Sequence, residues 1–252
     1  MPKRRTLKKQ KKYNYFNMSN NLSIIGSGGY GLIIGNNKYV IKLLYDTNSC
    51  KKLENEYLIQ LDAQKILNTE NDVAKVPKIY SYTSKTKKFR DTAYLCGIAM
   101  ERILGLPEYN GELIHLMFGC KPDEQLNVFL GRTTTDPIGL QNPSRGFFAS
   151  PEKIIDIWDS LDSQWTIDAA ANIIGRTCRL LIDNGIVPVD LEFVYGIDDQ
   201  IYVMDFGLCR YGTVNLQAFL ESRYVEGLAS EQYIPQEGQL GREAFLRGFW
   251  RN

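Results

Sequence analysis

Short apolar runs separated by glycine-rich or polar turns dominate the first hundred residues, and this pattern predicts β-strands. In chain order, the predicted strands cover residues 22–25, 32–34, 39–44, 76–82 and 93–100. Between the third and fourth of them, apolar side chains recur at helical spacing, which predicts a helix over residues 50–68. The first part of the chain is therefore expected to form an antiparallel sheet with one helix.

The rest of the chain has a mainly helical pattern. We expect helices at 151–163 and 164–184, strands at 192–195 and 200–204, and two helical pieces within 214–252. Residues 119–150 are rich in Gly, Pro, Thr and Asn, which predicts a long loop or insertion. A sheet followed by helices indicates an α+β fold.

Charge is distributed unevenly along the chain. The net charge is +1, but seven of the 30 Lys and Arg residues lie between Lys3 and Lys12, and no acidic residue precedes Asp46. We interpret residues 1–21 as a basic, disordered arm. Residues 3–12 could bind a polyanion or an import receptor, or could serve only as a solvated tail. No apolar run is long enough to span a bilayer, so no membrane partner is expected.

The cysteine and histidine content limits the possible chemistry. Five cysteines without a C-x-x-C pair, and no apolar signal segment, predict reduced thiols in an intracellular protein, either cytoplasmic or nuclear. The single histidine, His115, lies in an apolar helical pattern, which favours a structural role. A Cys/His zinc site and a Ser-His-Asp mechanism are therefore not expected.

A glycine-rich turn joins the first two predicted strands. Gly26, Gly28 and Gly31 follow the G-x-G-x-x-G spacing, with Ile33 two residues later. Between two strands, such a turn can lay its backbone N–H groups over phosphates. An ordinary glycine-rich hairpin is the alternative.

A lysine and two glutamates extend this pattern. Lys42 lies in the apolar strand Val40-Ile41-Lys42, where a lysine must either snorkel to solvent or meet an anion. The following helix offers Glu54 and Glu56, of which we favour Glu56. Asp205 ends a second apolar strand and is followed by Phe-Gly, which suits a Mg²⁺ ligand.

With these motifs in this order, residues 22–212 resemble the protein-kinase-like superfamily. The resemblance implies a two-lobe fold, with an antiparallel N-lobe at 22–104 and a reduced helical C-lobe at 105–252. It also implies ATP and Mg²⁺ as cofactors, with Lys42 on the phosphates. Met100 resembles the gatekeeper, and the backbone of Glu101 and Ile103 would bind adenine.

A narrower resemblance rests on the second half of the chain. The segments 190–196, 204–206 and 233–235 resemble a fungal domain of unknown function that is often fused to zinc-finger proteins. That domain implies the kinase-like fold without an established activity.

The chain departs from the superfamily at the catalytic loop. Asp190 lacks the preceding His and Arg, and Tyr195 stands where an Asn is expected. Counted back from Asp205, the metal-binding position falls on Glu192, whose carboxylate could replace an amide oxygen. Asp190 could then orient an acceptor hydroxyl, on a protein or a small molecule. An atypical phosphotransferase and an inactive pseudokinase both remain open.

Overall fold

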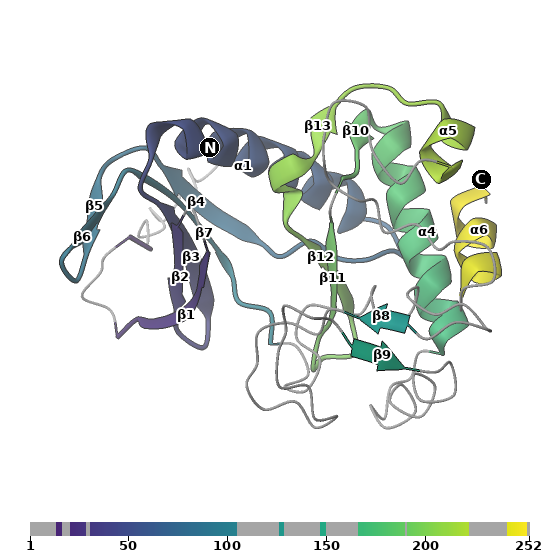
Figure 1. The fold of residues 1–252 in the computed structure, drawn as a ribbon, viewed down its shortest axis with the longest axis horizontal. Helices are drawn as coiled ribbons and strands as arrows, with labels where there is room; N and C mark the ends of the chain where they lie inside the picture. Colours follow the sequence, from purple (N-terminus) through teal and green to yellow (C-terminus); the bar gives the residue numbers. More distant parts are fainter. Residues whose placement is uncertain are drawn as a thin grey trace, which may run out of the picture.

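The chain forms a sheet with one long helix and a second, mainly helical part (Figure 1). The computed structural model describes residues 14–16, 21–28, 31–104, 126–128, 147–149, 166–189, 191–221 and 241–250. We call residues 21–104 the first lobe and residues 166–250 the second lobe. The elements of the first lobe are β1 (Ser23–Gly28), β2 (Gly31–Gly35), β3 (Tyr39–Leu44), α1 (Thr47–Leu67), β4 (Ile79–Thr83), β5 (Lys87–Phe89), β6 (Thr92–Tyr94) and β7 (Cys96–Glu101).

The later elements include two short strands that lie between the lobes in sequence. They are β8 (Leu126–Val128), β9 (Phe147–Ala149), α4 (Ile167–Asp183), β10 (Ile186–Val187), β11 (Glu192–Tyr195), β12 (Ile201–Met204), the 3-10 helix η2 (Phe206–Leu208), β13 (Arg210–Tyr211), α5 (Leu216–Glu221) and α6 (Arg242–Trp250). Two-stranded pairs form between β8 and β9, β10 and β13, and β11 and β12.

Five strands of the first lobe form one antiparallel sheet in the order β1-β2-β3-β7-β4. The register places Lys42 of β3 opposite Ile33 of β2 and Ile98 of β7. Lys42 is therefore in the middle strand of the sheet, where its backbone is held on both sides.

Side chains of β3 alternate between the two faces of the sheet, as the period of a strand requires. Tyr39, Ile41 and Leu43 are buried on one face and belong to a cluster that also contains Phe16. Next to Phe16, Tyr15 stacks on Tyr80 with the ring centroids 4.5 Å apart. These contacts correct the expectation that all of residues 1–21 are disordered, because residues 14–16 lie against the sheet.

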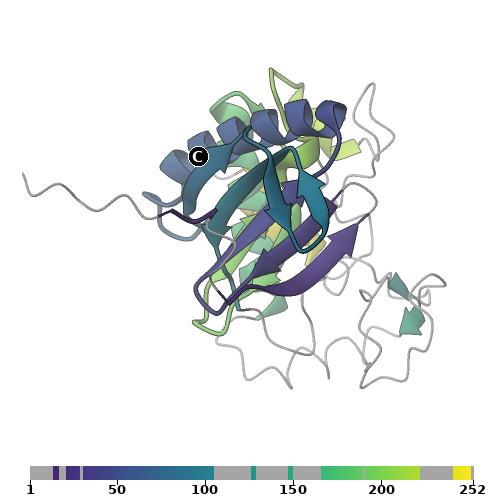
Figure 2. The same ribbon diagram turned by 90° about the vertical axis from the view of Figure 1, so that its left-hand side faces the viewer.

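Helix α1 connects the two lobes. Asp46 caps its first turn, where the carboxylate accepts a hydrogen bond from the Ser49 N–H at 2.8 Å. The helix contacts β4 and β7 in the first lobe, and α4 and η2 in the second. In Figure 2, where the first lobe faces the viewer, α1 runs across the top of the sheet. Side chains on this helix can therefore reach the junction between the lobes.

Helices α4 and α6 pack side by side in the second lobe (Figure 1). Their backbones approach closely at two glycines: a Cβ on Gly175 would lie 2.1 Å from the Phe245 carbonyl oxygen, and one on Gly248 would lie 2.1 Å from the Asn172 carbonyl oxygen. Phe245 and Phe249 complete the core between these helices. Glycine at both positions permits this packing, because any side chain would overlap the opposite backbone.

A short segment after α1 ties the first lobe to the second. The Lys75 N–H donates to the Ile201 carbonyl, and the Val203 N–H donates to the Lys75 carbonyl, both at 2.8 Å. These bonds attach the chain that leads into β4 to strand β12. The position of β12 is therefore coupled to the first lobe.

The predicted fold class, an α+β protein of two lobes with an antiparallel sheet in the first, is confirmed. Helices 50–68 and 164–184 appear as α1 and α4. The hairpin of β5 and β6 was not predicted, and the predicted loop at 119–150 contains β8 and β9. The predicted helix at 151–163 lies outside the described residues. Within the described ranges, no helix is long and apolar enough to cross a membrane.

Candidate functional site

A cavity of about 680 Å³ lies where the two lobes meet. Both lobes line it: the first with β1, β2, β3, α1, β7 and the segment after β7, and the second with β11, β12 and the residue after β12. Its lining residues are Ile25, Gly26, Ile33, Val40, Lys42, Glu56, Gln60, Met100, Glu101, Arg102, Ile103, Leu104, Glu192, Val194, Met204 and Asp205. The cavity thus gathers most of the candidate residues from the sequence in one place.

Three charged side chains meet at one part of this cavity. Lys42 Nζ lies 2.9 and 3.0 Å from the two carboxylate oxygens of Glu56 and 3.4 Å from Asp205 Oδ1. Of the two glutamates that the sequence left open, Glu56 is the partner, while Glu54 is exposed. The lysine therefore bridges a helix carboxylate and a carboxylate that ends a strand of the other lobe.

Burial and charge act against each other in the Lys42–Glu56 pair. Burial alone would lower the pKa of Lys42, but the carboxylates of Glu56 and Asp205 outweigh it and hold that pKa above its usual 10.5. Burial raises the pKa of Glu56, and the charge of Lys42 opposes this shift. Because Lys42 contacts both oxygens of Glu56 at hydrogen-bond distance, we describe the pair as an ion pair.

Asp205 has an unusual backbone conformation. Its φ of 56° and ψ of 65° lie in the left-handed region, which aspartate tolerates better than most residues. The next residue, Phe206, is fully buried in the core of the second lobe. The anchored phenylalanine and the left-handed turn together fix the Asp205 carboxylate at the cavity, where 46% of the side chain stays exposed.

Glu192 begins β11 and lies opposite Met204 of β12. Met204 is the residue that directly precedes Asp205. Its side chain is exposed and lines the same cavity as Asp205. Asp190, the candidate for orienting an acceptor, lies outside the described residues. Among the residues that the structure describes, no three His, Cys, Asp or Glu side chains are grouped to hold a metal. Near Lys42, the described acidic groups of the cavity are therefore the carboxylates of Asp205 and Glu192, in addition to Glu56, which is paired with Lys42.

The end of β7 and the segment after it line another part of the cavity. The Glu101 N–H donates to the Lys78 carbonyl at 2.8 Å, and the Arg102 N–H donates to the Lys38 carbonyl at 3.3 Å. No described residue accepts a hydrogen bond from the Ile103 N–H. Within the described part of the chain, the Ile103 N–H thus remains as a donor for a ligand.

Only part of the glycine-rich turn is seen to line the cavity. Gly26 and Ile33 line the cavity, and 37% of Ile33 is exposed. Gly31, which is described, does not line it. At Gly31 a Cβ would lie 2.1 Å from the Leu43 carbonyl oxygen, so glycine is needed there for packing against β3.

Gln60 is a cavity residue that was not predicted from the sequence. It lies one helical turn after Glu56 and only 2% of it is exposed. Its Nε2 is 4.0 Å from Met100 Sδ. A glutamine at a helix position where the pattern calls for an apolar residue was the available signal.

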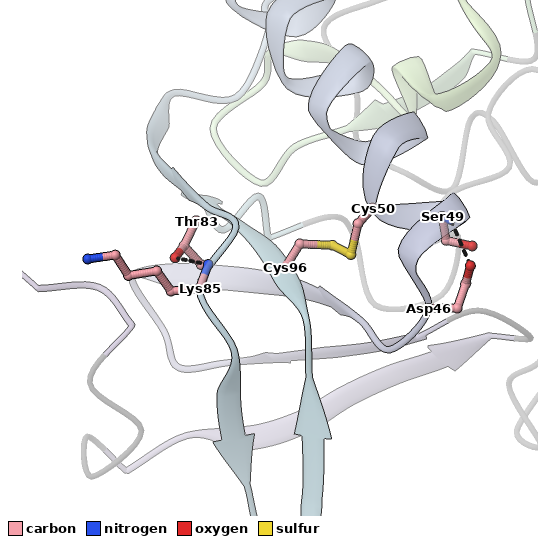
Figure 3. The surroundings of a disulfide bond; sticks show 6 residues. All are labelled: Asp46, Ser49, Cys50, Thr83, Lys85 and Cys96. Atoms are coloured by element: carbon pink, nitrogen blue, oxygen red, sulfur yellow. Dashed lines mark hydrogen bonds between the residues drawn. A yellow bond between two sulfur atoms is a disulfide. The ribbon is translucent and has the colours of Figure 1, made fainter.

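The cysteines correct a second expectation. Cys50 of α1 and Cys96 of β7 form a disulfide, whereas the sequence predicted reduced thiols. Figure 3 shows this bond beside the Asp46–Ser49 cap. Because disulfides are rare in cytosolic proteins, the intracellular location stays a prediction without support from the thiols. Cys120 and His115 lie outside the described residues.

Comparison with solved structures gives distant likenesses. The chain is similar to the protein in the ternary complex of streptomycin, ATP and APH(2")-IIa, with a TM-score of 0.33 and 16% sequence identity. The alignment covers 77% of this chain and 68% of that one. No family model matches the chain, and no curated protein matches it. At this similarity, residue roles cannot be transferred, and the narrower resemblance to a fungal domain gains no support.

Proposed function

We propose that the protein binds ATP with Mg²⁺ in the cavity between its lobes and transfers a phosphoryl group to a hydroxyl acceptor. The single observation that carries this proposal is the placement of Lys42 between Glu56 and Asp205 on the cavity wall. A fixed cation can bind phosphate oxygens, and a strand-end carboxylate can hold the metal that accompanies them.

The shape of the cavity suits a nucleotide. Apolar side chains from both lobes, including Val40, Val194 and Met204, can enclose a flat base. The Glu101 carbonyl and the Ile103 N–H offer an acceptor and a donor, which complement the amino group and a ring nitrogen of adenine. The charged end at Lys42 then receives the phosphates.

The donor set at this end fits Mg²⁺. This ion prefers oxygen ligands and commonly uses one or two carboxylates together with phosphates and water. Asp205 and Glu192 are two exposed carboxylates on the same cavity and would hold it. When bound, Mg²⁺ would neutralise charge on the transferred phosphoryl group. Lys42 would bind and orient the phosphates, and Asp190 would accept the proton of the acceptor hydroxyl.

A second function, nucleotide binding without transfer, is favoured by a separate observation. Asp190 lacks the neighbouring His and Arg that the resemblance calls for. The protein would then act as an interaction module. The acceptor, and a polyanion or import receptor for residues 3–12, also stay predictions.

Thermal unfolding with ATP, with and without Mg²⁺, tests the binding step. A ligand at 100 times its Kd adds about 2.7 kcal/mol to the free energy of unfolding when it binds only the folded state. We expect a Mg²⁺-dependent rise in Tm for the intact chain and its loss in Asp205→Asn. Asp198→Asn, an exposed aspartate that does not line the cavity, is the control. No shift with any nucleotide from a folded sample would refute the proposal.

A further inference from the structure

The amide of Gln60 is buried at the cavity wall. Only 2% of the residue is exposed, and the cavity is the space that it lines. Within the described part of the chain, its Nε2 donates only to Met100 Sδ, at 4.0 Å, and a thioether is a weak acceptor. Among the described residues, none donates a hydrogen bond to Gln60 Oε1. Because a buried polar group without a hydrogen-bond partner destabilises the folded chain, this amide requires an explanation.

Its neighbours on α1 do not provide that explanation. The other buried positions of the helix are Leu53, Glu56, Ile59, Ala63 and Leu67. Glu56 uses both carboxylate oxygens for Lys42, and the remaining positions are apolar. A leucine or methionine at position 60 would continue this packing without an unsatisfied group.

The position of Gln60 relates it to a specific part of the ligand. Glu56 lies one turn earlier on α1, at the charged end of the cavity, and Met100 precedes Glu101, at the end proposed for the base. A nucleotide that joins these ends passes Gln60 along one side. If the Glu101 carbonyl and the Ile103 N–H take the N6 and N1 atoms of adenine, its adjoining edge carries N6 and N7.

We propose that Gln60 forms a base-reading subsite that recognises the N6–N7 edge of adenine. Oε1 accepts a hydrogen bond from the N6 amino group and Nε2 donates one to N7, which is the bidentate pairing that glutamine makes with this edge in nucleic acids. The weak contact between Gln60 Nε2 and Met100 Sδ is given up when the base binds, because the thioether side chain of Met100 is flexible and can move aside. This inference rests on the proposed nucleotide function and adds a specificity-determining residue to it.

The test compares ATP with 7-deaza-ATP, which replaces N7 by a C–H group and keeps N6 and N1. Kd values are measured by calorimetry with Mg²⁺ on the wild-type chain and on Gln60→Met, which keeps the length of the side chain. We expect wild type to bind 7-deaza-ATP about tenfold more weakly than ATP, and Gln60→Met to bind the two almost equally.

Two further variants make the test specific. Gln60→Asn withdraws the amide by one methylene and should also bind the two nucleotides almost equally. Gln64→Met changes the glutamine one turn later, whose Oε1 accepts from the Ile79 N–H at 3.1 Å and which does not line the cavity. This control should keep the wild-type preference.

The outcomes separate the two proposals. Equal binding of ATP and 7-deaza-ATP by wild type overturns the subsite even if the variants fail to fold. A preference that persists in Gln60→Met also overturns it, while ATP binding itself stands. If wild type binds no nucleotide, the proposed function fails and the subsite fails with it.

Discussion

Lys42 donates to both carboxylate oxygens of Glu56 from one ammonium group, at 2.9 and 3.0 Å, across the gap between a strand and a helix. The side chain of Glu56 is 6% exposed and that of Lys42 is 26% exposed. Removing only the lysine therefore leaves a carboxylate in a place that water hardly reaches.

We expect Lys42→Met to lower the free energy of unfolding by about 2 kcal/mol. This is less than the ~3–5 kcal/mol for a fully buried pair, because Lys42 keeps some contact with water. The double variant Lys42→Met/Glu56→Gln should regain part of the loss, since it removes the unpaired charge. Urea unfolding of the two variants and wild type measures this. A double variant less stable than Lys42→Met would contradict the ion pair.

The same pair predicts a dependence on alkaline pH. Because folding raises the pKa of Lys42 above 10.5, its contribution to stability is present below pH 10.5 and is lost as the pH rises through its folded-state value. The free energy of unfolding, measured as a function of pH, checks this prediction. Lys42→Met should not show this part of the stability loss in that pH titration.

Asp190 provides the prediction that separates transfer from binding. We expect Asp190→Asn to abolish phosphoryl transfer and to leave the Mg²⁺-dependent rise in Tm with ATP unchanged, because its proposed partner is the acceptor hydroxyl. Transfer of labelled phosphate to candidate acceptors, measured beside the thermal shift, checks both parts. Turnover that survives the substitution would exclude Asp190 from this role.

The disulfide between Cys50 and Cys96 predicts a redox-dependent stability. It closes a loop of 46 residues, so chain entropy gives a stabilisation of about 2–4 kcal/mol. We expect a reductant such as TCEP to lower Tm by on the order of 10 °C. The Cys50→Ser/Cys96→Ser variant should melt at the lower temperature with or without TCEP. A wild-type Tm that TCEP does not move would contradict the bond.

The two buried thiols predict a resistance to alkylation. Burial raises the pKa of Cys178 and of Cys209 to about 12. Since only the thiolate reacts, iodoacetamide at pH 8 should label neither residue in the folded chain and both in urea. Peptide mapping by mass spectrometry provides the measurement. Labelling of either residue before unfolding would show that the core opens around it.

The contact of α4 with α6 predicts a steric effect at Gly175. An added methyl group would lie 2.1 Å from the Phe245 carbonyl oxygen, so the helices must move apart. We expect Gly175→Ala to destabilise the chain by about 1–3 kcal/mol. Gly212→Ala is the matched control, because the nearest atom to its added Cβ is Val187 Cγ2 at 3.8 Å. Equal stability of the two variants would be inconsistent with the close contact.

Strand β3 shows what could be predicted from the sequence. The apolar run at residues 39–44 predicted the strand that contains Lys42, and the need of this lysine for an anion pointed to the following helix. Both inferences depend on local periodicity and on one charge. A strand and the need of a lysine for an anion both depend on residues close in the sequence, so they can be predicted from the sequence.

Helix α1 shows the limit of the same reasoning. Its apolar residues were expected to face the core, yet Leu58 is 48% exposed while Glu56 and Gln60 are buried. The orientation of the helix depends on Lys42 and on the cavity, which lie elsewhere in the chain. The pairing of Cys50 with Cys96 could not be predicted for a related reason, because it requires the Cα atoms to come within 5.7 Å in the folded protein.

The close contact of α4 with α6 also has a consequence for folding during synthesis, because the two helices leave the ribosome at different times. Helix α4 leaves the ribosome on the order of 60 residues ahead of α6, which corresponds to several seconds at ~5–20 residues per second. During this interval the face of α4 that holds Gly175 has no covering helix. The first lobe can close its own sheet meanwhile. A nascent chain at this stage has a folded first lobe and an exposed apolar face on α4. This is the form that a chaperone would bind.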